Sequence, residues 1–276
     1  MGIALTSPVN CTQSNKLYHH NNTTFTNCNL DYHEKIFLGF ASVIGVFFAG
    51  PCLAFAVFYS KKCYMYAPYS MLYNIMLFLS GVVGTFISMV CYNWGETLIT
   101  FFAYVPLPTC FACLMVHVGN ILLTKRYDCR LRDGILVSAS ILIVVIQLSV
   151  LLSAPVYVRF EDGPVMYWKW KLSQSYCHSG LAIITVFGMS LCCYRDYPHG
   201  ASIFGVSMSS LILWVFYMCI GEYQIGIITP VFLGAAGFIF LLMYGIPELA
   251  FLYYNYKFIF SSSSNDESTV RLFSDV

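Results

Sequence analysis

The sequence predicts an all-α membrane protein, a receptor-like bundle of seven transmembrane helices. Hydrophobic residues make up 58% of the 276 residues and charged residues only 10%, whereas about 25% of a soluble domain is charged. Apolar runs near the 20 or so residues that a membrane-spanning helix needs fill almost the whole chain. The seven runs cover residues 36–59, 68–91, 98–124, 134–158, 179–194, 201–220 and 227–256.

Polar segments set the limits of the runs. A polar stretch, residues 1–35, precedes the first run, and a basic pair at Lys61 and Lys62 ends it. The third run is followed by the most basic loop, 125–133, and the fourth by a polar, aromatic loop at 159–178. The sequence thus divides into three parts: an extracellular tail at 1–35, a bundle at 36–257 and a cytoplasmic tail at 258–276.

The fifth and sixth runs are counted separately because residues 195–200 are expected to form a loop. Pro198, His199 and Gly200 follow two charged residues, and proline and glycine both break helices. Proline also occurs inside two other runs. Pro106 and Pro108 are expected to kink the third run, and Pro247 the seventh.

Lysine and arginine in short loops set the orientation of the bundle. With the amino terminus outside and the carboxyl terminus in the cytoplasm, nine basic residues lie inside and five outside, which satisfies this rule. The inner set is Lys61, Lys62, Lys125, Arg126, Arg130, Arg132, Arg195, Lys257 and Arg271; the outer set is Lys16, Lys35, Arg159, Lys169 and Lys171.

The amino-terminal tail carries features of an extracellular segment. Asn10, Asn21 and Asn22 each begin an acceptor pattern for N-glycosylation. Cys11, Cys28 and Cys177 are expected on the same side of the membrane. A disulfide bond can join Cys11 to Cys28 or Cys28 to Cys177, and an odd count leaves one partner unassigned.

The other cysteines are expected in lipid or on the reducing side. Cys110 and Cys113 form a CxxC pattern in the third run, which we interpret as small side chains packing between helices. Cysteines near the expected cytoplasmic surface are candidates for palmitoylation. These are Cys63, Cys129, Cys192 and Cys193.

Two ionisable residues lie within the apolar runs, where such groups are costly and mark functional candidates. His117 precedes Lys125 by eight residues and Glu248 precedes Lys257 by nine. At 1.5 Å per residue both lie about 12 to 14 Å from the cytoplasmic boundary. A direct hydrogen bond or ion pair between them is one expectation, and separate partners such as a backbone carbonyl or water are the alternative.

The sequence predicts no catalytic centre, metal site or cofactor, and nucleic acid is not an expected partner. Heptahelical zinc hydrolases need several histidine and aspartate ligands within the membrane. Only one histidine, His117, falls within the predicted runs in a position to serve. We therefore expect a protein that is not an enzyme.

Short motifs along the bundle resemble the retinoic-acid-induced orphan receptors of class C. The third run carries Cys-Phe-Ala-Cys-Leu-Met-Val-His at 110–117, followed by Asn120, and 27–31 is similar to the family's cysteine-acidic entry to helix 1. His199 and Gly200 match its His-Gly before helix 6, and Trp214 matches a helix 6 tryptophan. The closest match is in the seventh run, with Phe-Leu-Leu-Met-Tyr at 240–244 and Ile-Pro-Glu-Leu at 246–249.

The resemblance implies a G-protein-coupled receptor fold without a large ligand-binding ectodomain. It places His117 where other class C receptors have a lysine of the cytoplasmic ionic lock, and it makes Asn120, Pro247, Glu248 and Trp214 further switch candidates. Tyr217 and Phe238 stand where the family has tryptophans, and the family's long tail is cut short. This divergence and the compact length are also compatible with a virally captured copy.

The leading hypothesis is an orphan-type receptor in the plasma membrane, or in a host cell membrane if viral, that modulates signalling through its cytoplasmic loops. The expected partners are the lipid bilayer, a heterotrimeric G protein or arrestin, and a second receptor in a homo- or heterodimer. Ser274 and Val276 end the chain like a PDZ ligand. The alternatives are a heptahelical transporter or channel and a non-signalling membrane scaffold. The expected coupling residues are Lys125, Arg126, Arg130, Arg132 and Arg195.

Overall fold

A computed structural model of the chain describes seven ranges of residues, and within them the fold is helical with no strand. The described residues are 32–66, 71–91, 105–129, 131–153, 179–195, 198–221 and 225–263. The predicted glycosylation sites, disulfide candidates and PDZ-like terminus lie outside them (Asn10, Asn21, Asn22, Cys11, Cys28, Cys177, Ser274 and Val276).

The helices follow one another with short connections. An unlabelled helix, Ser179–Leu191, lies between α5 and α7. The π-helical segment η2 joins α8 to α9 without a break. The bounds are α1 Tyr32–Tyr66, α2 Leu72–Cys91, α4 Pro106–Tyr127, α5 Asp133–Ser153, α7 Pro198–Gly221, α8 Ile225–Phe240, η2 Leu241–Gly245 and α9 Ile246–Ser263.

Five of these segments are long and apolar enough to cross a membrane, which confirms a multi-pass, all-α membrane protein in a lipid bilayer. The fourth and fifth predicted runs correspond to two shorter apolar helices, Asp133–Ser149 and Ser179–Leu191. The count of seven spans therefore stays a prediction. The five are Ile36–Phe58, Leu72–Met89, Pro106–Tyr127, His199–Cys219 and Pro230–Tyr254.

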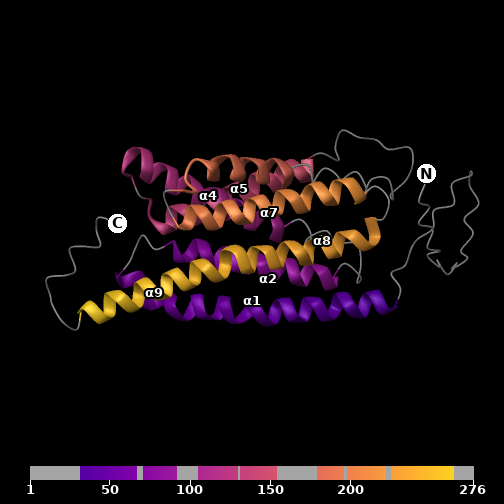
Figure 1. The fold of residues 1–276 in the computed structure, drawn as a ribbon, viewed down its shortest axis with the longest axis horizontal. Helices are drawn as coiled ribbons and strands as arrows, with labels where there is room; N and C mark the ends of the chain where they lie inside the picture. The colour runs from indigo at the N-terminus through magenta and orange to yellow at the C-terminus, as the bar shows by residue number, and fades with distance from the viewer. Residues whose placement is uncertain are drawn as a thin grey trace, which may run out of the picture.

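The helices lie side by side along one long axis (Figure 1). α1 packs on α2 and α8, α2 packs on α4, α4 packs on α5, and α7 packs on α8. The beginning of α1 and the end of α9 lie at opposite ends of the bundle (Figure 1). The described path therefore carries the chain from one end of the bundle to the other.

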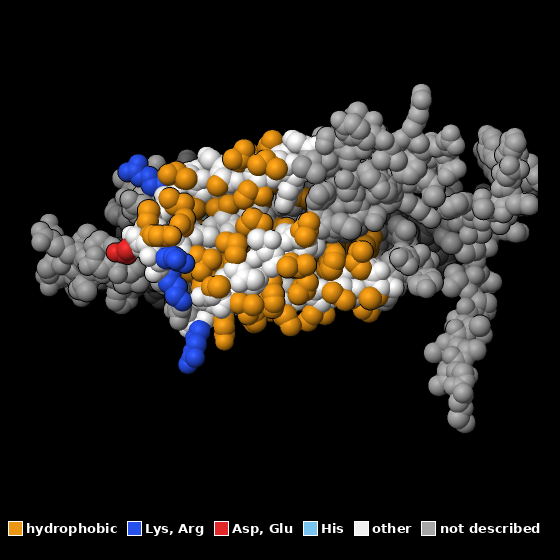
Figure 2. All heavy atoms as spheres, turned by 90° about the horizontal axis from the view of Figure 1, so that it is seen from above, with side chains coloured by type: hydrophobic (Ala, Val, Ile, Leu, Met, Phe, Trp, Pro, Cys, Tyr) orange, Lys and Arg blue, Asp and Glu red, His pale blue; other side chains and the backbone are white. Residues whose placement is uncertain are grey.

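The surface of the bundle divides into an apolar flank and a basic end (Figure 2). Side chains of α1 such as Phe37, Phe47 and Phe58 are more than half exposed along the flank. An exposed apolar band of this extent suits contact with lipid rather than water. Basic side chains gather at the end where α9 lies (Figure 2). The exposed ones in the described part of the chain include Lys125, Arg126, Arg132 and Arg195.

Two boundary predictions were wrong, and both involve proline. Residues 198–200 were expected in a loop, but Pro198 is the first residue of α7. Pro106 and Pro108 were expected to kink a helix interior, but they lie in the first turn of α4. Proline is favoured in the first turn because the amide groups there have no partner within the helix. Each of these prolines therefore begins a helix rather than interrupting one.

Pro247 changes the helix locally, although not as the simple kink that the sequence suggested. The five residues before α9 form the π-helix η2, in which the amide of Ile246 donates to the carbonyl of Leu241, five residues back. Proline lacks an amide proton and its ring crowds the carbonyl four residues earlier. The wider turn relieves this crowding. Such π-bulges often occur at functional sites.

Polar side chains bind α2, α4 and α5 together near the basic end. Asp133, at the start of α5, accepts hydrogen bonds from the amides of Tyr73 (2.6 Å) and Asn74 (3.2 Å) in the first turn of α2. It therefore acts as a cap for a helix that it does not belong to. The Asn74 side chain donates to the carbonyl of Cys113 on α4 (3.1 Å) and accepts from Ser140 on α5 (2.9 Å).

Close apolar packing dominates elsewhere in the core. The ring of Phe86 on α2 is fully buried between Gly45 of α1 and Gly237 of α8. Small residues allow this approach of neighbouring helices in a membrane bundle. Cys110 and Cys113 are buried in the same core, which is the packing role predicted for them.

We expect Gly45→Ala to destabilise the bundle, because a Cβ at this position would lie 2.2 Å from the Phe86 ring. Overpacking of a rigid core costs about 1–3 kcal/mol, which outweighs the gain of up to about 1 kcal/mol in helix propensity. Gly39→Ala on the same helix is the control, since no atom lies within 4 Å of its Cβ position. Thermal unfolding of the purified chain in detergent measures both. Equal melting temperatures for the two variants would contradict the packing described for Phe86.

Candidate functional site

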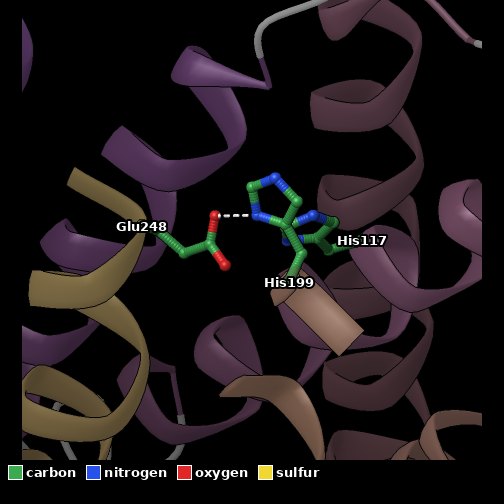
Figure 3. A group of neighbouring side chains, drawn as sticks. All are labelled: His117, His199 and Glu248. Atoms are coloured by element: carbon green, nitrogen blue, oxygen red, sulfur yellow. Dashed lines mark hydrogen bonds and ion pairs between the residues drawn. The ribbon is translucent and has the colours of Figure 1, made fainter. Parts of the chain in front are cut away.

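Three ionisable side chains from three helices meet inside the bundle near its basic end (Figure 3). His117 comes from α4, His199 from the first turn of α7, and Glu248 from α9. One nitrogen or oxygen atom from each lies within 4.8 Å of the other two. His117 and Glu248 are each 2% exposed, whereas His199 is half-buried. The cluster therefore lies in the bundle with one partly open side.

Both carboxylate oxygens of Glu248 have partners on α7. Nδ1 of His199 lies 2.6 Å from Oε2, and the hydroxyl of Ser202 donates to Oε1 at 3.0 Å. His199 is the second residue of α7 and Ser202 the fifth, so the carboxylate sits beside the amino-terminal turn of that helix. Helix amino termini carry partial positive charge and stabilise anions. Two hydrogen bonds and the helix dipole thus compensate the buried carboxylate.

His117 is linked to the π-helical segment. Its Nδ1 is hydrogen-bonded to the hydroxyl of Tyr244, four residues before Glu248. Tyr244 is fully buried, and its ring packs edge-on against Phe78 with 4.6 Å between ring centroids. Phe240 packs against Phe78 and also against Phe111 of α4. This aromatic floor keeps one side of the polar cluster apolar.

The matching depth of His117 and Glu248 predicted that the two would meet, and the structure brings them together within the cluster. The hydrogen-bond partner of Glu248, however, is His199 rather than the predicted His117. The sequence analysis assigned His199 to a loop, and used it only as part of a family motif. The proline just before it was the available signal, because proline in the first helical position places the next residue inside the helix.

The other switch candidates lie apart from this cluster. Asn120 is buried on α4, where its side-chain oxygen accepts from the amide of Leu131 at 3.1 Å and so holds the loop after α4. Pro247 is exposed on the outer face of α9. Trp214 packs its ring against Gly180, and so joins α7 to the helix Ser179–Leu191.

The expected coupling residues border the cluster at the basic end. Lys125 donates to the carbonyl of Cys192 at 3.0 Å, which joins the end of α4 to the turn after the helix Ser179–Leu191. Arg126, Arg132 and Arg195 are exposed. Arg130 lies outside the described residues.

The palmitoylation candidates differ in access. Cys129 and Cys192 are exposed free thiols. Cys193 is 1% exposed within the core, so its thiol is shielded from an acyltransferase. Cys63 lies in α1, and the placement of its side chain is not described.

No protein-family model matches the chain, and no curated protein matches it significantly. The resemblance to class C orphan receptors therefore stays a prediction that rests on the motifs alone. The site has to be interpreted from its own chemistry.

Two abilities follow from the arrangement. Imidazole and carboxylate groups exchange protons and bind transition metals. The cluster also joins α4, α7 and α9, so any rearrangement of these helices has to break a buried hydrogen bond. The hydrogen bonds within the cluster define its present state. We call this set, His117, His199, Ser202, Tyr244 and Glu248, the polar lock.

A double-mutant cycle on His199 and Glu248 tests the central bond. We expect His199→Ala to cost about 3 kcal/mol of unfolding free energy, because it leaves a buried carboxylate without its imidazole. Glu248→Ala removes the same bond, so the double variant should cost less than the sum of the singles by about 1–3 kcal/mol. Denaturant unfolding in detergent measures the three variants beside Ser138→Ala, which alters an exposed hydroxyl on α5. Strict additivity would contradict the bond.

Proposed function

We propose that the chain is a seven-span receptor-like membrane protein of the G-protein-coupled type, in which the polar lock stabilises the resting arrangement. Its amino terminus is extracellular and its basic end faces the cytoplasm. A cytoplasmic signalling partner, most simply a heterotrimeric G protein, binds at that end. The observation that carries the proposal is the buried cluster joining α4, α7 and α9 just inside the basic end.

The arrangement of the helices supports this proposal. Five apolar helices and two shorter ones follow the order of the seven predicted runs. α1 begins and α9 ends at opposite ends of the bundle, as an odd number of crossings requires (Figure 1). Basic side chains at the α9 end agree with the rule that lysine and arginine favour the cytoplasmic side (Figure 2).

The chemistry of the cluster supports a switch. In the proposed numbering of spans, α4 is the third, α7 the sixth and α9 the inner part of the seventh. A polar bond between helices in an apolar bundle has two defined states, made and broken, and a two-state element of this kind is what a receptor needs. A partner that binds better when the helices are apart shifts the population towards the broken state.

Breaking the lock should raise basal signalling. Tyr244→Phe removes only the hydroxyl that bonds to His117. A loss of about 1 kcal/mol from the resting state raises the active population about fivefold. Tyr254→Phe is the matched control, since that tyrosine is 69% exposed on α9. G-protein dissociation in cells at matched surface levels measures both. Equal basal activity in the two variants would argue against the lock as a resting-state restraint.

Neutralising the basic end should abolish coupling. We expect Arg126, Arg130 and Arg132 replaced together by Gln to lose G-protein activation, because these charges face the expected cytoplasm. The control replaces three basic residues of the expected outer loop, Arg159, Lys169 and Lys171, by Gln. Activation by the control but not by the first variant supports the proposal. No activation by the unmodified chain or by Tyr244→Phe would replace it with a non-signalling scaffold.

A further inference from the structure

We propose that His117, His199 and Glu248 form a binding site for a divalent transition-metal ion, with zinc as the best fit. Two imidazoles and one carboxylate are a ligand set of catalytic and regulatory zinc sites, with a fourth position left for water. Hard cations such as Mg²⁺ prefer oxygen ligands, so this set selects against them. The inference concerns binding alone and does not depend on the proposed receptor function.

The geometry of the two histidines fits one shared ion. Their ring centroids lie 5.5 Å apart. Two imidazoles on one tetrahedral zinc, with Zn–N distances of ~2.0–2.1 Å, have ring centroids about 5 Å apart. Because the candidate ligand atoms of all three residues already lie within 4.8 Å of one another, side-chain rotation is enough to gather them. No helix has to move by a turn or change its partner.

The bond between His199 and Glu248 would be replaced when the ion binds. Its 2.6 Å length is shorter than the separation of about 3.3 Å between two ligand atoms on a tetrahedral zinc. The imidazole and carboxylate therefore rotate apart by less than 1 Å at their ligand atoms, and the ion takes the place of the shared proton. The ion's charge then compensates the carboxylate that the imidazole N–H compensates now.

Two neighbours already orient the ligands as outer partners of metal sites do. The Tyr244 hydroxyl is bonded to Nδ1 of His117, which fixes the ring and directs the second nitrogen to be the ligand. The Ser202 hydroxyl bonds to Oε1 of Glu248 at 3.0 Å, while Oε2 is the oxygen on the His199 side. The arrangement thus has ligands, orienting partners and, on the floor, the apolar ring of Phe78.

The site has a route by which an ion can enter. The His199 side chain is 25% exposed, whereas that of Glu248 is 3% exposed. His199 lies in the first turn of α7, next to the loop that precedes it, so it is the outermost of the three ligands. Water and a hydrated ion can reach it from the basic end without crossing the apolar floor.

Metal binding by the purified full-length chain tests the proposal. The chain is treated with a chelator in detergent, and zinc is titrated in competition with a chromophoric indicator. Glu248→Gln and His199→Gln each remove one ligand and keep a similar shape. The matched control, His178→Gln, removes a histidine that is not in the cluster. Because the chain has twelve cysteines that also bind zinc, the measured quantity is the difference between variants.

We expect the unmodified chain and the His178→Gln control to bind one equivalent of zinc that Glu248→Gln and His199→Gln do not bind at the same concentration. Tyr244→Phe should retain the site with about tenfold weaker affinity, as is typical when an outer partner is lost. Cobalt in place of zinc should give tetrahedral absorption bands without thiolate charge transfer. Zinc should also raise the melting temperature of the unmodified chain and of the control alone.

Equal zinc binding by all variants, or a cobalt spectrum dominated by thiolate, would overturn the proposal. So would an unmodified chain that binds no zinc after chelator treatment. If a ligand variant does not elute as a single species from size-exclusion chromatography, Tyr244→Phe decides the result through its affinity. An unchanged affinity in Tyr244→Phe then counts against the site. A zinc site without any effect of Tyr244→Phe on signalling would refute the receptor proposal and leave this one intact.

Discussion

The carboxylate of Glu248 imposes a constraint on the packing around it. An ionised group in an apolar bundle is costly unless protein partners replace water. The chain meets this cost by starting α7 beside the carboxylate, so that His199, Ser202 and the positive end of a helix dipole all face it. The position of α7 along the bundle is therefore tied to a single residue of α9. Pro198 reinforces the arrangement, because it begins the helix at the position that puts His199 in reach.

The same constraint gives meaning to the π-helical segment. Pro247 stands directly before Glu248, and the wider turn of η2 accommodates the proline within a continuous helix. Tyr244 lies in that turn and reaches His117. Proline, tyrosine and glutamate within five residues thus set up both hydrogen bonds of the lock from one stretch of chain. A straight α-helix through this region would require a residue other than proline at 247.

The membrane class and the order of the helices follow from composition and apolar length, and five of the runs are confirmed as candidate spans. The depth argument also brought His117 and Glu248 to one level. It did not find His199, because proline and glycine beside charges are equally typical of a loop and of a helix start. Nor could the sequence show that Asp133 caps α2, since that contact joins residues about 60 positions apart. Partners of this kind depend on which helices pack together, and apolar runs of similar composition do not reveal it.

The hydrogen bonds also divide the described bundle into two units. Asn74, Asp133 and Ser140 tie α2, α4 and α5 together, whereas His199, Ser202 and Glu248 tie α7 to α9. The bond between His117 and Tyr244 connects one unit to the other, and the aromatic contacts around it are apolar. Apolar contacts in a bundle can slide with small changes in free energy, but a buried hydrogen bond is either made or lost. A relative movement of the two units therefore has its sharpest free-energy step at His117 and Tyr244, which makes this bond rather than the stronger carboxylate pair the natural place for a switch.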